Sequence, residues 1–479
     1  MNTILLQPTD VLFFRDGRPM GGASAGHGAA WPLPSVINHA FHAALHRAGA
    51  VFKEAHPHRR GRSGIYEEAR DRRFGSLVTA GPFPVCTSGA DHTWFFPRPA
   101  DADDSGTVFL HPHRVDANSS LPAPCKYPVI STKPPSKDTP KPWWSEGAWN
   151  AYLGSPQRSE LSARSFLKRD DDFADTEHQI GIGIDPETQT QDKTNFYSAH
   201  YLRLRDEFRL GLFAEAMDKV NDGANPDRDL IHDLLNGHPE QIVVGGQQRI
   251  CTASRCDATG PLPLPRGLHA TADFKPCGNG KFAVKWILLT PSIWPEIQGG
   301  TSKSGEVIHA HPGGWLPNWV FLDWDAENRV ARASDRSGEV LLKLRSGKLR
   351  RDYSGPRARR VAEGESAIGA RLVAAIVPKP IPVTGWALAN DTDRPEGGAK
   401  STHLAVPAGS VYYFEAEPDA TGGPGNAIAL AAALNWHGSD AKPATIKNRR
   451  STLLGEKGFG LGVCGTWELF PNIGGRSVK

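Results

Sequence analysis

The segment 455–465 constrains the fold of this chain more than any other. It carries five glycines in eleven positions, beside the apolar run 465–470. Glycine adopts positive φ without steric cost, and it lacks the Cβ atom that would keep a phosphate group or a neighbouring strand at a distance. The segment therefore predicts a loop whose bare backbone closely approaches a ligand or another part of the protein, and a glycine-rich turn without a ligand is the alternative. The five positions are Gly455, Gly458, Gly460, Gly462 and Gly465.

Three of these glycines, Gly460, Gly462 and Gly465, form a G-x-G-x-x-G pattern. In dinucleotide-binding proteins this pattern follows a strand, opens a helix and precedes an acidic residue by about twenty positions. The sequence offers neither the helix nor the acidic residue here. We therefore expect no Rossmann site and no cofactor.

A second informative segment opens the chain. Residues 4–14 are expected to form a β-strand, because residues 11–14 are a β-prone apolar run, and Asp16-Gly17 is typical of a turn. A stretch of small residues follows at 21–28. The spacing of apolar residues then predicts a helix over residues 35–47.

The predicted helix 35–47 begins at Ser35, a preferred N-cap residue. Its apolar residues fall on one face, and His39, His42 and His46 fall on the opposite face. Spacings of three and four could hold a metal ion, but the sequence has no His-Glu-x-x-His arrangement at this place. We predict a solvated histidine stripe and no metal site.

Taken in order along the chain, several motifs resemble one protein family. They run through about residues 4–467, and residues 100–175 cannot be aligned with it. Val243-Val-Gly245-Gly246-x-x-Arg249 also looks like a family feature. The other motifs are Phe-Phe-Arg-Asp-Gly-Arg-Pro at 13–19, Trp-Pro-Leu-Pro-Ser at 31–35, Gly385-Trp386, the segment 406–415 and the glycine-rich segment 455–465. With these motifs in this order, the chain resembles the third subunit of the Cmr complex, the type III-B CRISPR effector, in the RAMP superfamily.

The resemblance implies a noncatalytic subunit that binds the 5′ tag of the CRISPR RNA. Its implied partners are the large polymerase-like subunit and a backbone RAMP subunit, and target RNA would be met only indirectly. Recognition of the target would come from pairing with the guide, while the protein reads shape and backbone.

The fold class that we predict is α+β, with two tandem ferredoxin-like (RRM-like) domains elaborated by loops and insertions. The chain has 479 residues, which exceeds the usual size of a single core, so two domains are expected. We place an N-terminal domain at 1–265 and a C-terminal domain, which carries the glycine-rich segment, at 266–479. Alternating prolines at 261–265 predict an extended linker between them.

Each predicted domain has its own series of elements. In the first, the order strand, helix, strands, helix, strand is that of the split β-α-β fold. After residues 4–14 and 35–47, it comprises a strand pair at 201–205 and 208–213, a helix at 227–235 and a closing strand at 241–244. In the second, we predict strands at 282–290, 371–377 and 410–414 and a helix at 426–436.

The net charge of +3 and the pI near 8.5 do not describe a nonspecific polycation, so local clusters matter more. Guanidinium groups suit an RNA clamp because they present a planar fork of donors. Arg15 and Arg18 would clamp the RNA, Asp16 would orient them, and His27 would add a hydrogen bond. A second wall would combine glycine backbone, an aromatic ring for stacking and basic side chains. Its candidate residues are Lys447, Arg449, Arg450, Lys457, Gly458, Phe459, Gly460 and Gly462.

Two other functions stay open. One is a metal-independent RAMP-type endoribonuclease that processes CRISPR RNA with His27 as acid or base. The other is a protein-only scaffold with no RNA affinity of its own. The acidic run 170–172 could bind a divalent ion, but a solvated loop is the preferred interpretation, and we assign no catalytic residue.

The six cysteines are scattered and lack two close pairs, which favours free thiols over a structural zinc site and indicates a reducing compartment. The sequence contains neither a secretory signal nor an apolar run long enough for a bilayer. We therefore expect a cytoplasmic protein without a membrane partner.

Overall fold

The structure is a computed structural model of the chain. It describes residues 1–15, 25–26, 31–49, 76–89, 91–104, 107–115, 120–134, 136–137, 140–154, 166–168, 170–184, 187–188, 190–218, 228–256, 260–277, 279–301, 307–343, 367–387 and 398–470. Candidate residues Asp16, Arg18 and His27 lie outside these ranges.

The N-terminal half is built on one antiparallel sheet with the strand order β13-β14-β1-β11-β3-β4-β7-β8, and β12 pairs with β11. Helix α1 lies between β1 and β3 in the chain, and α5 lies between β12 and β13. The elements are β1 Asn2–Pro8, α1 Pro34–Arg47, β3 Leu77–Ser88, β4 Asp91–Pro97, β7 Trp143–Ser145, α3 Glu146–Leu153, β8 Phe166–Lys168, α4 Asp170–Phe173, β11 Phe208–Asp218, β12 Arg228–Asp229, α5 Leu230–Leu234, β13 Glu240–Val243 and β14 Ile250–Arg255.

The C-terminal half is built on a smaller antiparallel sheet with the order β20-β25-β15-β26. Helix α6 connects β25 to β26, and the glycine-rich segment forms the short turn η4 followed by β26. The elements are β15 Phe282–Leu288, β20 Ala370–Ile376, β25 Val411–Ala416, α6 Gly425–Leu434, η4 Gly455–Lys457 and β26 Gly462–Gly465.

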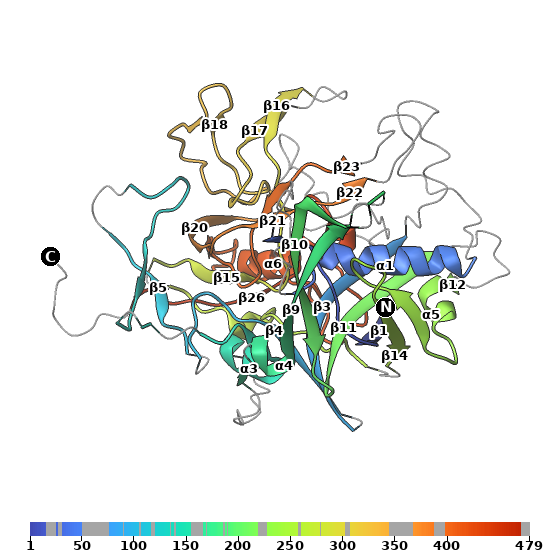
Figure 1. The fold of residues 1–479 in the computed structure, drawn as a ribbon. Coiled ribbons are helices and arrows are strands. Elements are labelled where there is room, and N and C mark those ends of the chain that lie inside the picture. The colour runs from blue at the N-terminus through green and yellow to red at the C-terminus, as the bar shows by residue number, and fades with distance from the viewer. Residues whose placement is uncertain are drawn as a thin grey trace.

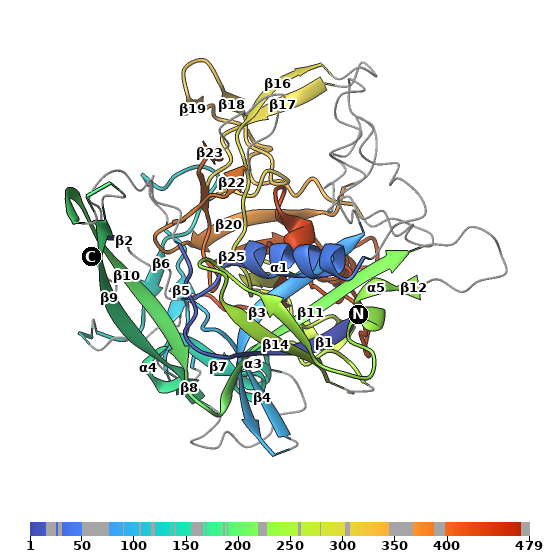
Figure 2. The same ribbon diagram turned by 45° about the vertical axis from the view of Figure 1, so that its right-hand side comes forward.

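Further strands pair with one another outside these two sheets. β9 and β10 form a long hairpin at the left of Figure 2, and β2 pairs with β10. The remaining pairs are small hairpins, of which β16–β17 and β18–β19 lie at the top of both views (Figures 1 and 2). The elements are β2 Ala25–Gly26, β5 Leu110–Pro112, β6 Val129–Ser131, β9 Ala174–Ile184, β10 Gln191–Leu204, η3 Thr271–Asp273, β16 Ile297–Thr301, β17 Val307–His311, β18 Trp324–Asp325, β19 Val330–Ala331, β21 Ile381–Val383, β22 Trp386–Ala387, β23 Gly398–Ala399 and β24 His403–Ala405.

The two sheets pack face to face, with α1 and α5 on the outer face of the first sheet and α6 on the outer face of the second. Strand alternation produces these layers, because successive side chains point to opposite faces. In β1, Ile4 and Leu6 join the core under α1, whereas Leu5 faces the other sheet. In β15, Trp286 packs toward α6, and Ile287 faces the first sheet. The chain therefore forms a helix–sheet–sheet–helix stack with a shared core between the sheets.

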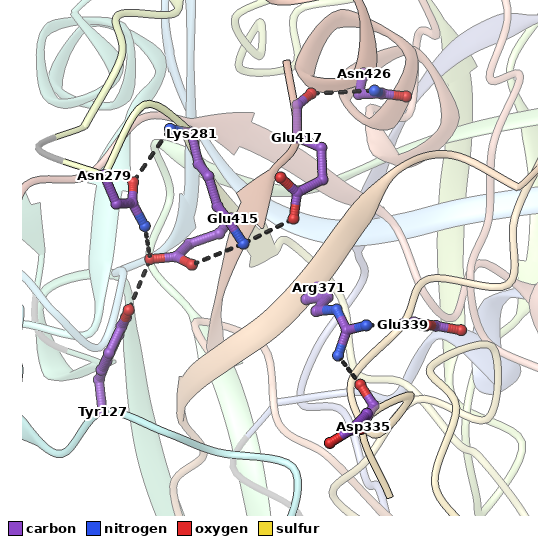
Figure 3. Close-up of polar contacts among 9 residues, drawn as sticks. All are labelled: Tyr127, Asn279, Lys281, Asp335, Glu339, Arg371, Glu415, Glu417 and Asn426. Atoms are coloured by element: carbon purple, nitrogen blue, oxygen red, sulfur yellow. Dashed lines mark hydrogen bonds and ion pairs between the residues drawn. The ribbon is translucent and has the colours of Figure 1, made fainter. Parts of the chain in front are cut away.

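The segment that the sequence could not place, residues 100–175, is attached to both sheets. The backbone N–H groups of Lys126 and Tyr127 donate to the carbonyl of Val373, at 2.8 and 3.0 Å. The Tyr127 hydroxyl donates to Glu415 at 2.8 Å, and Asn279 donates to the same carboxylate at 3.0 Å. Figure 3 shows these groups converging on Glu415. The carboxylate of Glu415 finds its hydrogen-bond donors within the chain, so this polar cluster has a structural role and holds the segment against the sheet.

A second group of charges in Figure 3 fixes the edge strand of the C-terminal sheet. Arg371 on β20 donates to the carboxylate of Glu339 at 3.0 Å and to the backbone carbonyl of Asp335. Lys281, just before β15, pairs with Glu417, just after β25, at 2.7 Å. The contacts of Arg371 hold residues 335–339 against the sheet.

Most predicted elements are confirmed. Helix α1 buries the predicted apolar face, including Ile37, Phe41 and Leu45, while His39 and His46 are exposed. The predicted strands of the second half correspond to β15, β20 and β25, and the predicted helix corresponds to α6. The buried Trp144 and Trp149 fill the core between the sheets, as expected for tryptophan.

Four expectations are wrong in detail. The opening strand ends at Pro8, because the chain leaves the sheet there, and Leu12 instead forms a bridge with Leu202 of β10 in another sheet. The residues at 201–205 and 208–213 are not paired with each other: β10 pairs with β9, and β11 pairs with β1 and β3. The strand beside β1 is β14, because β13 only forms the outer hairpin. The N-cap of α1 is Leu33, with Pro34 at the first turn.

The proline-rich stretch 261–265 is not a free linker. Leu262 and Leu264 are buried in the core between the sheets. The carbonyl of Pro265 accepts a hydrogen bond from the indole of Trp436 at 2.7 Å. Prolines keep the stretch extended, and alternate leucines anchor it.

Candidate nucleic-acid interface

The opening segment carries one described candidate, Arg15, which is exposed. Two residues earlier, Phe13 packs against Tyr201 of β10, with ring centroids 5.4 Å apart. The carbonyl of Phe13 accepts a hydrogen bond from the backbone N–H of Gly246 at 2.9 Å. The chain before Arg15 is therefore fixed between β10 and the turn that follows β13.

The turn after β13 explains the glycines of the motif that precedes Arg249. Gly245 has φ +80°, and a Cβ atom there would lie 2.5 Å from the carbonyl oxygen of Phe13. Gln247 and Gln248 follow with φ of 54° and 51°, a left-handed backbone that costs energy for residues with a side chain. This strained turn directs the chain so that the Arg249 side chain lies back over the sheet.

The guanidinium group of Arg249 lies over a buried aromatic ring. Its guanidinium carbon is 5.0 Å from the ring centroid of Tyr201, within the range of a cation–π contact. The Tyr201 hydroxyl donates a hydrogen bond to the side-chain oxygen of Gln247 at 2.7 Å. The same oxygen accepts a hydrogen bond from Arg249 at 3.4 Å. Tyr201 is buried and the Arg249 side chain is 27% exposed. Tyr201 therefore positions Arg249, whose outer face remains accessible; we call Tyr201 and Arg249 the Tyr201–Arg249 platform.

The charges around the platform are mixed. Asp10 pairs with Arg203 at 2.9 Å and lies 3.8 Å from Arg249. Arg203 also pairs with Glu177, and this hydrogen bond is the main reason why the pKa of Arg203 is raised. Asp10 therefore fixes the direction of two arginines. A guanidinium held in this way can stack on a nucleobase or bind a phosphate.

The glycine-rich segment has a different role from the one that its sequence suggested. A Cβ at Gly458 would lie 2.9 Å from the Cα of Ala80 on β3, at Gly460 it would lie 2.1 Å from the nitrogen of Ser451, and at Gly462 it would lie 2.3 Å from Nε1 of Trp286. The glycines are required for close contacts within the protein.

The amide groups of this segment are also occupied. The N–H groups of Lys457 and Phe459 donate to the carbonyl of Leu454, and that of Gly460 donates to the carbonyl of Pro291 at 2.8 Å. An amide nest for phosphate needs free N–H groups. The structure therefore gives no support to a phosphate cradle at Gly458, Gly460 and Gly462.

Three predicted side-chain contacts must be corrected. Phe459 is fully buried with Ile293 and cannot stack on a base. Arg450 is enclosed at the end of α6, where it donates to the carbonyl of Ala433 at 2.6 Å, and burial lowers its pKa to about 10. It satisfies a helix C-terminus. Arg449 is also buried.

Two lysines of the predicted second wall reach the surface. Lys447 is exposed and pairs with Asp440 at 2.9 Å. Lys457 is half-buried, and its Nζ lies 2.9 Å from Nε2 of His39 on α1. The structure thus brings the glycine-rich segment against α1, although more than 400 residues separate Lys457 from His39. It does not bring Lys447 to the same place.

The sequence analysis missed the Tyr201–Arg249 platform as a site. The glycine pair before Arg249 was the one sequence signal for this site. Tyr201 lies far from Arg249 in the chain, and only the tertiary structure brings these two residues together.

Among the described residues, no group of three or more His, Cys, Asp or Glu side chains could hold a metal ion. The six cysteines all lie among the described residues and form no disulfide bond with one another. The acidic run 170–172 belongs to the short helix α4. No described helix is both long and apolar enough to span a membrane.

Comparison with known proteins gives a family and distant structural likenesses. Two of the similar solved chains come from cryo-EM structures of the Type III-B Cmr-beta. One structure is bound to cognate target RNA, and the other is bound to cognate target RNA and AMPPnP. They share 13% and 14% identity, cover 86% of each chain, and have TM-scores of 0.36 and 0.35. No curated protein matches the chain. A family of CRISPR-associated proteins, Cas_Cmr3, matches residues 4–467, so the chain belongs to the Cmr3 family.

Proposed function

We propose that this protein is a noncatalytic RNA-binding subunit of a type III-B CRISPR effector complex, which holds the 5′ tag of the CRISPR RNA. It docks to the large polymerase-like subunit and to a backbone RAMP subunit, and it meets target RNA only through the guide. Membership of the Cmr3 family over residues 4–467 supports this proposal.

We further propose that each half is a ferredoxin-like domain, with the boundary near residue 265. The order β14-β1-β11-β3 supports this for the first half, since it places the fourth strand beside the first and the third between the first and second. The order β26-β15-β25-β20 repeats that arrangement in the second half. α1 and α5 occupy the helix positions of the first half, and α6 occupies the second helix position of the other.

The observation that carries the RNA-binding proposal is the Tyr201–Arg249 platform beside Arg15. Single-stranded RNA is bound by basic groups that follow its backbone and by flat groups on which bases stack. Arg249 offers both, because its guanidinium is charged, planar and held by Tyr201 and Gln247. Arg15 lies in the chain segment that packs against the same ring.

The test is binding of a labelled repeat-derived tag RNA to the purified chain with its large-subunit partner, at several salt concentrations. Arg249→Ala and Arg15→Ala should each weaken binding by about tenfold and make the salt dependence less steep by roughly one charge. Arg249→Lys should keep the salt dependence but lose affinity, because the ammonium group does not stack. Arg332→Ala, on an exposed hairpin, is the control and should bind like the wild type.

Three results would contradict the proposal. Wild-type affinity that does not respond to Arg249→Ala or Arg15→Ala would remove the platform from the RNA site. Absence of binding at low salt would favour the protein-only scaffold. Cleavage of the RNA that is lost in His27→Ala would move the protein into the endoribonuclease class.

A further inference from the structure

A pocket of about 400 Å³ opens at the seam between the two sheets. Its walls come from the start of α1, from β3, from the segment after β15 and from the loop before β25. A volume of this size lies in the range of small-ligand sites. The pocket is separate from the Tyr201–Arg249 platform, because neither residue lines it.

The walls of the pocket are rigid. Seven of the lining residues are proline, and Trp31 and Trp143 meet edge to face with ring centroids 5.4 Å apart. The indole N–H of Trp31 donates to the carbonyl of Pro82 at 3.0 Å, which fixes its ring. Gly409 closes one wall: a Cβ there would lie 2.4 Å from the carbonyl oxygen of Arg98. Flat and apolar walls of this kind suit a flat and apolar ligand.

The pocket carries one charged side chain, Arg98, and none of its described lining residues is acidic. Nη1 of Arg98 donates to the carbonyls of Pro99 and Ala102. Nε of the same side chain is buried and has no hydrogen-bond partner. This atom is closed off from the pocket, so a ligand would meet the exposed part of the half-buried Arg98 side chain. Its positive charge has no carboxylate beside it among the described lining residues, which favours a ligand that offers a hydrogen-bond acceptor.

The position of the pocket connects it with the predicted RNA site. Trp31 directly follows the segment 15–28, which carries Arg15, Arg18 and His27. Pro34, on the pocket wall, is also the neighbour of Gly458, since a Cβ at Gly458 would lie 3.4 Å from its Cβ. The pocket therefore lies next along the chain to the first segment that the sequence assigns to RNA binding, while the glycine-rich segment, which contacts protein, lies against its wall at Pro34.

We propose that the pocket holds one nucleobase, turned out of the bound RNA strand and lying against the tryptophan and proline walls with a ring nitrogen or carbonyl oxygen facing Arg98. This proposal rests on the proposed RNA-binding function. An aliphatic side chain from a protein partner would fill the same walls, but it would offer no acceptor to the charged Arg98 side chain. The described residues therefore favour a heteroaromatic occupant.

The experiment compares binding of repeat-derived tag RNAs in which a single base is removed at each position in turn while the backbone is kept. With wild-type protein, base removal should weaken binding by about 5- to 100-fold at one position. Ala408→Leu narrows the pocket, and the same base removal should then have little further effect, because the two changes remove one contact. Ala151→Leu, a half-exposed residue on α3 outside the pocket, is the matched control.

Thermal melting establishes that each variant is folded. Arg98→Met provides a second test if Ala408→Leu fails to fold, and it should reduce the same position-specific effect. Equal effects of base removal in wild type and in both pocket variants would overturn the proposal, as would the absence of any sensitive position. Retained RNA binding by Ala408→Leu together with lost association with the large subunit would assign the pocket to a protein side chain. Wild-type protein that binds no RNA would overturn the proposed function and this inference together.

Discussion

At the scale of single residues, one charge is placed where strand alternation calls for an apolar side chain. Lys285 on β15 points into the core between the sheets, and its Nζ pairs with Asp101 at 2.8 Å. Tyr152 donates to the same carboxylate at 2.6 Å, and Tyr413 donates to it at 3.3 Å. Burial lowers the pKa of Lys285, and the carboxylate partly offsets this effect. The network connects the 100–175 segment to β15 and β25 of the C-terminal sheet.

We predict that Asp101→Ala lowers the free energy of unfolding by about 3 to 5 kcal/mol, because it leaves a buried ammonium without a partner. The double variant Asp101→Leu/Lys285→Leu should lose less, since it removes both charges. Urea unfolding followed by circular dichroism measures the difference. Asp440→Ala breaks the exposed pair with Lys447 and should cost about 1 kcal/mol or less. A single variant that is no less stable than the double variant would contradict this account of the pair.

At the scale of elements, the glycine-rich segment acts as a joint between the halves. Gly458 lies against β3 of the first half, and Gly462 lies against β15 of the second. Lys457 reaches α1 between them. The close approach that the sequence predicted is real, but the neighbour in the structure is protein backbone.

Gly458→Ala should destabilise the protein more than Gly422→Ala. Both glycines have left-handed φ, of 96° and 80°, so both substitutions carry a backbone cost of about 1 to 2 kcal/mol. Only at Gly458 does the new methyl group also meet backbone, whereas nothing lies within 4 Å of it at Gly422. Midpoints of urea unfolding compare the two variants. Equal losses would show that the contact with β3 contributes nothing.

At the scale of the whole molecule, the two proposed domains share a core. Phe213 of the first sheet and Ile287 and Tyr413 of the second belong to the same buried cluster, and the stretch 261–265 runs through it. Separation of the halves would expose this apolar surface to water, which is unfavourable in proportion to its area.

We therefore expect the chain to unfold in one cooperative transition. Circular dichroism and tryptophan fluorescence should give the same urea midpoint, which is the usual test of two-state behaviour. The isolated fragment 266–479 should be poorly soluble, because it exposes one face of the shared core. Two separate transitions, or a well-behaved fragment, would show that the halves are independent domains.

Much of the secondary structure could be predicted from local pattern. The 3.6-residue spacing in 35–47 gave α1, and the apolar runs of the second half gave β15, β20 and β25. β3 was missed because Gly81, Pro82 and Pro84 interrupt its pattern, and proline normally excludes a central strand. The pairing of strands was less predictable than their existence, because β10 and β11 are adjacent in the chain but belong to different sheets.

The sequence by itself determined the family, most elements and the positions where backbone must come close to something, because these depend on local residue order and on glycine's missing Cβ. Only the tertiary structure decided what the glycines approach, that Phe459 and Arg449 are buried, and that Arg249 lies over Tyr201. The physical reason is that burial and contact depend on which distant segments share a core. Local sequence does not specify those partners.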